Sequence, residues 1–401
     1  MNVQTLKGFR DFLPKEAKKR GYVINTLKKV FELYGFEPLE TPALEYEEIL
    51  TGKYGDEGDK LMYKFEDLGK RKVALRYDQT VPLARVVSQY RNDISLPFKR
   101  YQIQNVWRAE NTQKGRYREF IQCDVDTVGS PSLSADAEII AVAAKSLEAL
   151  GFLDYVIYVN NRQNLNRLIG KNISEKDITS VIRVLDKLKK IGNEAVIEEI
   201  KNLGIDEQEA QKILDNVKNA KPDESLNEIF LLLKQYGIPD EKVKYLPTLA
   251  RGLDYYTGTI FEIEVQGYDA GSVAGGGRFD NLIGIFAGTD IPAVGLAFGF
   301  DRLMEAMEDL SLFPQNLAVI KALVTNTNKF SPKISETLRE YGINTQLFAD
   351  TKDLEKQLKY ADKKGIPFVV IANENNFILK DMQTGNQEEL TLEEIVAKLK
   401  S

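Results

Sequence analysis

The sequence lacks histidine altogether, and this absence removes several kinds of active site from its 401 residues. Ser–His and Cys–His nucleophile pairs are excluded, as are histidine metal ligands and an imidazole acid or base. Cysteine occurs only as Cys123, which excludes an internal disulfide and is compatible with a reducing compartment. Chemistry in this protein must therefore depend on Arg, Lys, Asp, Glu and Tyr side chains, on backbone groups and on bound metal.

Long apolar runs are also missing. No run approaches the roughly 18 apolar residues of a membrane-spanning helix, and the N-terminus lacks the apolar core of a secretory signal. We therefore expect a cytoplasmic protein without a membrane partner. The net charge of −6 argues mildly against a nucleic-acid partner. It does not exclude one, because phosphate is attracted by local basic patches rather than by the total charge.

The first 165 residues are predicted to alternate between helices and short strands. Apolar residues at helical spacing, such as Val23, Leu27 and Phe31, predict an amphipathic helix over 15–34. Pro38 and Pro42 make 36–44 an extended segment suited to an edge or an interface. Further on we expect strands at 73–76, 98–108 and 116–128, a turn at 111–115, and helices at 81–90 and 134–150.

The composition changes after about residue 165 and becomes helical and charged until about residue 240. This change predicts a small helical domain, 166–239, inserted between the parts 1–165 and 240–312 of one catalytic domain. Strands are expected at 259–265 and 294–300. After a linker, 317–401 alternates between strands and helices, which predicts a separate α/β domain. Its expected strands are 318–324, 343–348, 367–371 and 376–381, and its expected helices are 332–341, 352–364 and 392–400.

The hairpin predicted over 98–128 combines a basic tip with acidic side chains along its second strand. Side chains two residues apart face the same side of a strand, so Gln122, Asp124 and Asp126 point together. A buried face with such residues needs a bound polar partner to offset the cost of desolvation. The planar fork of arginine suits phosphate, although arginines also occur on hairpins that are merely exposed and charged.

Three further stretches carry residues of interest, and each has an ordinary structural explanation when taken alone. Arg251, Tyr255 and Tyr256 crowd a predicted turn. The glycine run at 271–277 is interpreted as a loop that lets backbone approach a ligand closely, but it matches neither GxxxxGK[ST] nor GxGxxG. Arg302 stands where a helix begins, in a dipole field that favours anions.

In their order and spacing these stretches resemble the histidyl-tRNA synthetases, a family of class II aminoacyl-tRNA synthetases. Residues 36–45, 99–129 and 292–307 are similar to motifs 1, 2 and 3, and RGLDYYTG at 251–258 is similar to the histidine-specific stretch. The resemblance implies an α+β catalytic domain built on an antiparallel sheet, an inserted helical domain and a C-terminal α/β anticodon-binding domain. It also implies a ligase that joins histidine to its tRNA with ATP and Mg²⁺, and a homodimer formed through motif 1.

The resemblance assigns the ATP contacts mainly to arginines. Arg108 resembles the motif 2 arginine that grips the α-phosphate, and Arg251 resembles the arginine that approaches it from the other side. Arg302 resembles the motif 3 arginine placed against adenine and the γ-phosphate. Glu110 stands where the family contacts adenine, and the positions that hold phosphates and support the site are Arg116 and Arg118.

The resemblance also implies a histidine site. Asp78 and Thr80 fall in the stretch near the α-ammonium group, where some relatives carry Glu in place of Asp78. Gln122 resembles the residue beside the α-amino and carboxylate groups, and Asp126 and Tyr256 resemble the pair that binds the imidazole, with Tyr255 packed close by. A neutral imidazole has one N–H donor and one acceptor nitrogen, so a carboxylate and a phenol suit its two sides.

Four lysines fall at helical spacing in the expected anticodon-binding domain: Lys352, Lys356, Lys359 and Lys363. They are candidates for phosphate contacts with tRNA, although a solvated helix face explains them about as well.

Two other functions stay open on the sequence alone. One is a synthetase-like regulatory subunit of ATP phosphoribosyltransferase, and the other is a class II synthetase for another amino acid. The retained Arg108, Arg251 and Arg302 argue against the first, and RGLDYYTG argues against the second.

Overall fold

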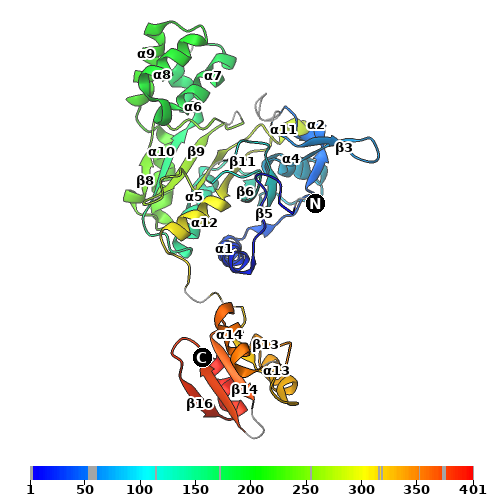
Figure 1. Cartoon of the computed structure of the whole chain (residues 1–401). Coiled ribbons are helices and arrows are strands. Elements are labelled where there is room, and N and C mark those ends of the chain that lie inside the picture. Colours follow the sequence, from blue (N-terminus) through cyan, green and yellow to red (C-terminus); the bar gives the residue numbers. More distant parts are fainter. Residues whose placement is uncertain are drawn as a thin grey trace. The chain divides into compact units, whose positions relative to one another are not determined.

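The computed structural model describes residues 3–52, 61–112, 115–170, 173–252, 255–314, 317, 319–351, 353–372 and 376–400. The chain forms two compact units (Figure 1). The larger unit contains the N-terminal segment to Leu13 and Arg20–Phe313, and the smaller contains Pro14–Lys19 and Pro314–Ser401.

The larger unit is built on a mainly antiparallel sheet. Among the described residues eight strands form it, in the order β1-β5-β6-β11-β10-β9-β7-β8. Only the two outermost pairs, β1 with β5 and β7 with β8, are parallel. The strands are β1 (Glu37–Pro38), β5 (Phe98–Trp107), β6 (Glu119–Val128), β7 (Tyr155–Asn161), β8 (Val243–Tyr245), β9 (Thr259–Val265), β10 (Ala274–Arg278) and β11 (Ala293–Gly299). The antiparallel sheet expected from the resemblance is thus confirmed, and β1 lies at its edge as predicted.

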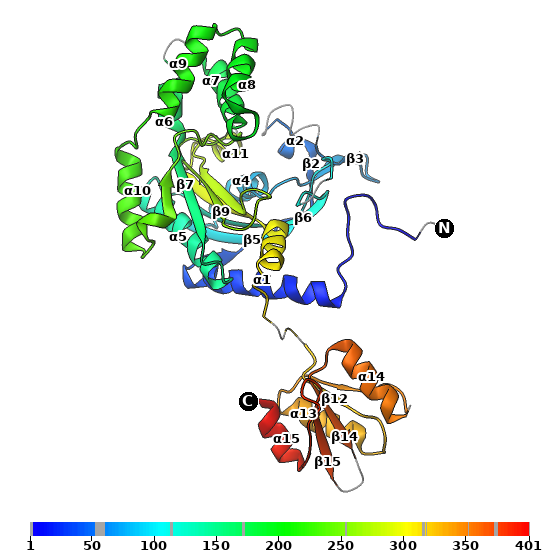
Figure 2. The same cartoon turned by 60° about the vertical axis from the view of Figure 1, so that its left-hand side comes forward.

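Helices cover one face of this sheet and leave the other for the site (Figure 2). The alternation of β6 separates the two faces, since Cys123 and Val125 join the main core while Asp124 and Asp126 face the opposite way. The helices that contribute to this core are α1 (Pro14–Leu33), α5 (Leu133–Ala149), α10 (Glu224–Gln235) and α12 (Phe300–Asp309).

A second layer lies beside the site. It contains α2 (Glu47–Leu50), α4 (Thr80–Gln89), α11 (Gly284–Ala287) and a small sheet in the order β2-β4-β3. The strands of that sheet are β2 (Leu44–Tyr46), β3 (Lys64–Glu66) and β4 (Lys72–Leu75). Leu83 of α4 packs with Phe279 and Ile291, which fixes the start of α4 near the open face of the large sheet.

The helical segment that was predicted as an insertion divides between two cores. Four helices share a separate core at one end of the unit (Figure 1): α6 (Arg162–Ile169), α7 (Glu175–Leu185), α8 (Leu188–Asn202) and α9 (Glu207–Lys218). The next helix, α10, buries Leu226, Ile229 and Leu233 in the core of the large sheet, beside α5. The predicted inserted domain, 166–239, therefore includes one helix too many. Helix α10 does not belong to the separate helical core, because its apolar face packs against the large sheet. A short 3-10 helix, Asp240–Lys242, leads into β8.

The smaller unit contains an α/β fold of its own. Its sheet has the order β13-β12-β14-β15-β16 among the described residues, with β12 parallel to both of its neighbours. The elements are β12 (Ala322–Val324), α13 (Ser331–Glu340), β13 (Thr345–Leu347), α14 (Leu354–Lys364), β14 (Phe368–Ala372), β15 (Phe377–Asp381), β16 (Gln387–Leu390) and α15 (Leu392–Lys400). Each strand and helix expected here is present, and β16 was not expected because it is polar and largely exposed.

Two local predictions are wrong. The glycine run was interpreted as a loop, but Gly275–Gly277 lie in β10 and pair with β9 on one side and β11 on the other. Strand β6 begins at Glu119 rather than at residue 116, because the backbone N–H of Arg118 donates to the carbonyl of Gly8.

In the described ranges, no helix has the length and apolar character that crossing a bilayer requires.

Candidate active site

The open face of the large sheet holds a cavity of about 540 Å³. Its floor is formed by β6, β10 and β11, and its rim by the loop after β5, the segment before β9 and the start of α12. A volume of this size is typical of small-molecule sites. Most of the site residues predicted from the sequence line this cavity: Thr80, Arg108, Glu110, Arg116, Gln122, Asp126, Arg251, Tyr255, Tyr256 and Arg302.

Two predicted site residues do not line the cavity. Asp78 is buried and accepts a hydrogen bond from the backbone N–H of Val81 at 3.4 Å. Arg118 donates from Nε to the carbonyl of Glu110 at 3.1 Å, so it shapes the loop after β5. Glu110 also pairs with Arg116 across 3.7 Å at the rim.

Arg108 and Arg302 are each anchored by a backbone carbonyl. Arg108 Nε donates to the carbonyl of Tyr77 at 2.9 Å, and its guanidinium carbon lies 5.2 Å from the centre of the Phe120 ring. Arg302 lies in the first turn of α12 and donates from Nη1 to the carbonyl of Ser272 at 2.8 Å. These contacts restrict the orientation of both guanidinium groups, which line one cavity.

Arg251 is held in an uncommon backbone conformation, with φ at 50°. Its Nη1 donates to Oε1 of Glu262 at 2.8 Å, and its guanidinium carbon lies 5.6 Å from the Tyr256 ring centre. Burial opposes the charge of Arg251, but Tyr256 and Glu262 outweigh it and raise the pKa of this arginine. Burial in turn raises the pKa of Glu262, and Arg251 partly opposes that shift.

At the other end of the cavity, Asp126 is paired with Arg100 inside the sheet. Arg100 Nη2 lies 2.7 Å from Asp126 Oδ2, and the two side chains are 0% and 4% exposed. Burial and the nearby Asp78 raise the pKa of Asp126 to about 6, while Arg100 acts in the opposite direction. Burial also raises the pKa of Asp124 well above its usual range. Arg100 thus offsets part of the desolvation cost of this strand, and the bound polar partner expected from the sequence stays a prediction.

Arg100 was missed in the sequence because it precedes its partner by 26 positions on another strand of the hairpin. The register pairs Arg100 directly with Asp126 and Gln102 directly with Asp124. A signal was available, since a hairpin with a known turn places those residues opposite one another. The predicted turn at 111–115 has the same centre as the observed register, so pairing across the predicted hairpin would have placed Arg100 opposite Asp126.

Glycines at three sheet positions make room for the side chains of the site. A Cβ on Gly275 would lie 1.9 Å from Arg251 Nη1, and one on Gly277 would lie 2.9 Å from the Tyr256 ring. A Cβ on Gly295 would lie 1.9 Å from Asp126 Oδ1. The glycine run therefore forms a strand without side chains, and functional side chains lie directly over its backbone. Glycine in a strand permits such close approach because it has no Cβ.

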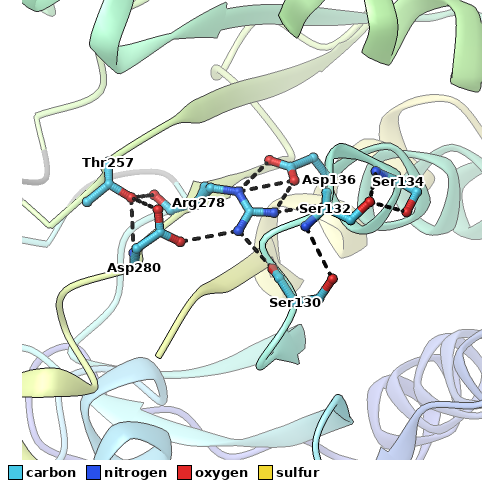
Figure 3. A network of polar contacts seen from close by, with 7 residues as sticks. All are labelled: Ser130, Ser132, Ser134, Asp136, Thr257, Arg278 and Asp280. Atoms are coloured by element: carbon cyan, nitrogen blue, oxygen red, sulfur yellow. Dashed lines mark hydrogen bonds and ion pairs between the residues drawn. The ribbon is translucent and has the colours of Figure 1, made fainter. Parts of the chain in front are cut away.

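A buried network around Arg278 supports the segment that carries Tyr255 and Tyr256 (Figure 3). Arg278 pairs with Asp136 of α5 and lies 3.2 Å from Asp280 Oδ1. Its carbonyl accepts the backbone N–H of Thr257 at 2.8 Å, and the Thr257 hydroxyl donates to Asp280 at 2.8 Å. Sequence analysis missed this network because Arg278 and Asp136 are 142 positions apart.

Replacing Asp136 by alanine should destabilise the larger unit by about 3–5 kcal/mol, because the buried charge of Arg278 would lose its partner. Denaturant unfolding followed by circular dichroism measures this change. Glu199→Ala is the matched control, since Glu199 pairs with Lys187 on the surface of the same unit. An Asp136→Ala unfolding midpoint equal to that of the control would mean that the network does not stabilise this unit.

Metal ligands are not clustered in the described part of the chain, where no group of three or more Cys, Asp or Glu residues is arranged to hold an ion. The cavity does contain carboxylates, among them Glu262, Asp186 and Glu110. A metal that needs only one or two protein ligands is compatible with such a site.

Family models of known proteins match residues in both units. A family model described as histidyl-tRNA synthetase matches residues 8–303, and one described as anticodon binding domain matches residues 318–401. The histidine–tRNA ligase of Cytophaga hutchinsonii is 41% identical over 448 aligned residues, covering 98% of each chain. That of Wolinella succinogenes is 41% identical over 420 aligned residues, covering 96% of this chain and 95% of the relative.

Solved structures show the same architecture. The crystal structure of histidyl-tRNA synthetase from Nostoc sp. PCC 7120 superposes with a TM-score of 0.86 at 33% identity, covering 100% of this chain and 99% of that chain. An ATP phosphoribosyltransferase regulatory subunit/histidyl-tRNA synthetase from Bacillus halodurans superposes with a TM-score of 0.74 at 23% identity, covering 90% of this chain and 97% of that chain. The second likeness concerns the fold alone.

Proposed function

Because this chain belongs to the histidyl-tRNA synthetase family and is a histidine–tRNA ligase, we propose that its cavity binds ATP at the arginine end and histidine at the Asp126 end. One observation carries the proposal: Arg108, Arg251 and Arg302 line the same cavity as Asp126 and Tyr256. Guanidinium groups suit phosphate, and a carboxylate with a phenol suits an imidazole.

In the proposed arrangement Arg108 and Arg251 approach the α-phosphate from two sides, and Arg302 contacts adenine and the γ-phosphate. Glu110 contacts adenine, while Arg116 lies near the phosphates and Arg118 supports the loop from outside the cavity. The anchoring of Arg108 and Arg302 by backbone carbonyls supports these roles, since donors fixed in advance need little reorganisation as charge develops.

For histidine, we assign the imidazole to Asp126 and Tyr256, and the α-amino and carboxylate groups to Thr80 and Gln122. Asp78 acts through its charge, because it contributes to raising the pKa of both Asp124 and Asp126. Tyr255 packs on Tyr256, with the ring centres 4.7 Å apart. A site that must hydrogen-bond its substrate rejects analogues that lack the matching groups.

The chemistry then requires alignment more than proton transfer by a side chain. The histidine carboxylate attacks the α-phosphorus of ATP, a P–O bond forms to the amino acid, and pyrophosphate leaves with the electrons of the broken bond. In the second step the 3′-terminal ribose hydroxyl of the tRNA attacks the carbonyl carbon, its proton passes to a phosphate oxygen of the adenylate, and AMP leaves with the electrons of the broken C–O bond. Arginines that hold the phosphate and spread its negative charge supply most of the stabilisation that such a reaction needs.

ATP is expected to arrive as its Mg²⁺ complex. Mg²⁺ keeps several waters and binds chiefly to phosphate oxygens with one or two carboxylates. Glu262 and Asp186 line the cavity near Arg251 and fit that small contribution. The ion would neutralise part of the charge on the leaving pyrophosphate.

Histidine-dependent exchange of pyrophosphate into ATP tests the proposal. The protein should catalyse exchange with histidine and not with other amino acids, and Asp126→Asn should raise the KM for histidine far more than the KM for ATP. Equal increases in both KM values would show that Asp126 does not contact the amino acid. Absence of histidine-dependent exchange would contradict the proposed reaction as a whole.

Transfer RNA contacts are proposed for one exposed face of α14. Lys356, Lys359 and Lys363 are exposed there, whereas Gln357 and Ala361 are buried; Lys352 lies outside the described residues. Lys356 and Lys359 pair with Asp353 and Glu355, which reduces the net positive charge of this face.

Replacing Lys356, Lys359 and Lys363 together by alanine should weaken tRNA binding about tenfold and lower its salt dependence, while histidine-dependent exchange stays unchanged. Filter binding at two or more salt concentrations measures the effect. Alanine at Lys333, Lys380 and Lys398 of the same unit is the control for total charge. An equal loss in both triple variants would assign the effect to net charge rather than to this face.

We further expect a cytoplasmic homodimer that uses the region of motif 1. Exposed apolar side chains in the neighbouring small sheet support this expectation, since Leu44, Tyr46 and Phe65 are 43%, 52% and 48% exposed. Sedimentation equilibrium measures the mass in solution, and a monomer at micromolar concentration would contradict the dimer.

A further inference from the structure

We propose that Arg100 is a positioning residue for histidine selection: it binds one carboxylate oxygen of Asp126 and so keeps the other as an acceptor for the imidazole N–H. Arg100 is fully buried and does not line the cavity, so it acts through Asp126. This inference rests on the proposed histidine site.

The sheet register places Asp126 between two very different neighbours. On β5 its direct partner is Arg100, whose Nη2 lies 2.7 Å from Asp126 Oδ2. On β11 its direct partner is Gly295, where a Cβ would lie 1.9 Å from Asp126 Oδ1. The carboxylate therefore bridges the two neighbours: Oδ2 contacts Arg100, and Oδ1 lies over the glycine, which itself lines the cavity. One oxygen is bound inside the sheet, and the other lies on the side of the ligand.

The remaining contacts of Arg100 are weaker than its pair with Asp126. Nη1 donates to Oε1 of Gln102 at 3.3 Å, and Nη2 donates to the carbonyl of Gln79 at 3.5 Å. The contact with Asp126 is an ion pair between two buried side chains, whereas the other two partners are neutral, and unlike charges attract strongly where the local dielectric is low. Asp126 is thus the main partner of the guanidinium, and a change at Arg100 acts first on that carboxylate.

Without Arg100, burial and Asp78 would raise the pKa of Asp126 further. Asp124 lies on the same strand and Asp78 lies before α4, and the only charged group that counters burial directly at Asp126 is Arg100, within the part of the chain that the structure describes. Arg108 acts on Asp124, and the facing position of β11 is the uncharged Gly295. A protonated Asp126 accepts only a weaker, neutral hydrogen bond and can present an O–H donor instead, so the N–H of the imidazole would lose its charged acceptor.

The experiment compares Arg100→Met and Arg100→Lys with the wild-type enzyme in histidine-dependent pyrophosphate exchange between about pH 5.5 and 8.5. Arg100→Met should raise the KM for histidine by about 10- to 100-fold, with the KM for ATP changed less than about twofold. Free histidine titrates equally in all assays, so the ratio of variant to wild-type KM reports the enzyme. Because the variant raises the pKa of Asp126, this ratio should be largest at low pH and fall as pH rises.

Arg100→Lys keeps the charge and should recover most of the affinity for histidine. Combining Arg100→Met with Asp126→Asn should add little to the effect of Asp126→Asn alone, because the two residues act as one unit. Thermal unfolding of each variant separates this effect from a loss of fold. Should Arg100→Met fail to fold, Arg100→Gln replaces it as the neutral variant and must show a rise in KM that is confined to histidine and shrinks with increasing pH.

Parallel increases in both KM values, or a ratio that is flat with pH, would overturn the inference and leave Arg100 as a structural residue. These outcomes leave the proposed function intact, since it depends on exchange by the wild-type enzyme. A wild-type enzyme without histidine-dependent exchange would instead contradict the proposed function, whatever the variants do.

Discussion

Replacing Arg251 by lysine is expected to lower the rate of histidine activation by about 10²–10³-fold, with the fold unchanged. The charge remains, but lysine lacks the planar fork that binds two oxygens at once. The position is unusually fixed: φ is 50°, Nη1 donates to Glu262 at 2.8 Å, and Gly275 leaves no side chain beneath the guanidinium. A flexible ammonium group in this place would reach Glu262 or the phosphate, but it would not orient the α-phosphate for attack.

Single-turnover formation of histidyl-adenylate measures this effect, and circular dichroism checks the fold. Arg71→Lys is the control, because Arg71 is exposed and pairs with Asp67 away from the cavity. The loss should appear in the rate constant rather than in the KM for histidine. Near-normal turnover of Arg251→Lys would mean that Arg251 does not contact the α-phosphate.

Much of the fold follows from local sequence signals. The helix predicted over 15–34 is observed as Pro14–Leu33, and the strand predicted over 98–108 as Phe98–Trp107. These elements have strong periodicity, which reports directly on the buried face. The cavity residues were found through motifs whose order and spacing are specific, and Arg108, Arg251, Arg302, Asp126 and Tyr256 do line one cavity.

The structural features that the sequence did not predict depend on contacts between residues far apart along the chain. The glycine strand β10 has no side-chain pattern of its own, so its identity is fixed only by pairing with β9 and β11. Helix α10 resembles its charged neighbours in composition, yet its apolar face meets α5 rather than the helical core. The pair Arg100–Asp126 likewise exists only once β5 and β6 are in register, and the pair Arg278–Asp136 only once α5 packs beside β10.

Replacing Gly295 by alanine is expected to raise the KM for histidine by about 10²-fold, although only one methyl group is added. The new Cβ would lie 1.9 Å from Asp126 Oδ1, 2.6 Å from its Cγ and 3.0 Å from the carbonyl of Val125. Since the carbonyl belongs to the paired strand β6, relief must come from the Asp126 side chain, which would swing away from the cavity. Overpacking of this kind costs about 1–3 kcal/mol in stability, so the fold should survive.

The control for this variant is Gly21→Ala, because Gly21 lies in α1 with open space around it and alanine favours helix. Exchange kinetics with histidine and ATP varied separately, together with thermal unfolding, measure both effects. The Gly295 variant should keep its KM for ATP, since the arginines at the other end of the cavity are not displaced. An unchanged KM for histidine would show that the imidazole does not depend on the position of Asp126 over Gly295. Asp126 and Gly295 face each other across two strands that are about 170 positions apart along the chain, so a contact of this kind arises only when the whole sheet has formed.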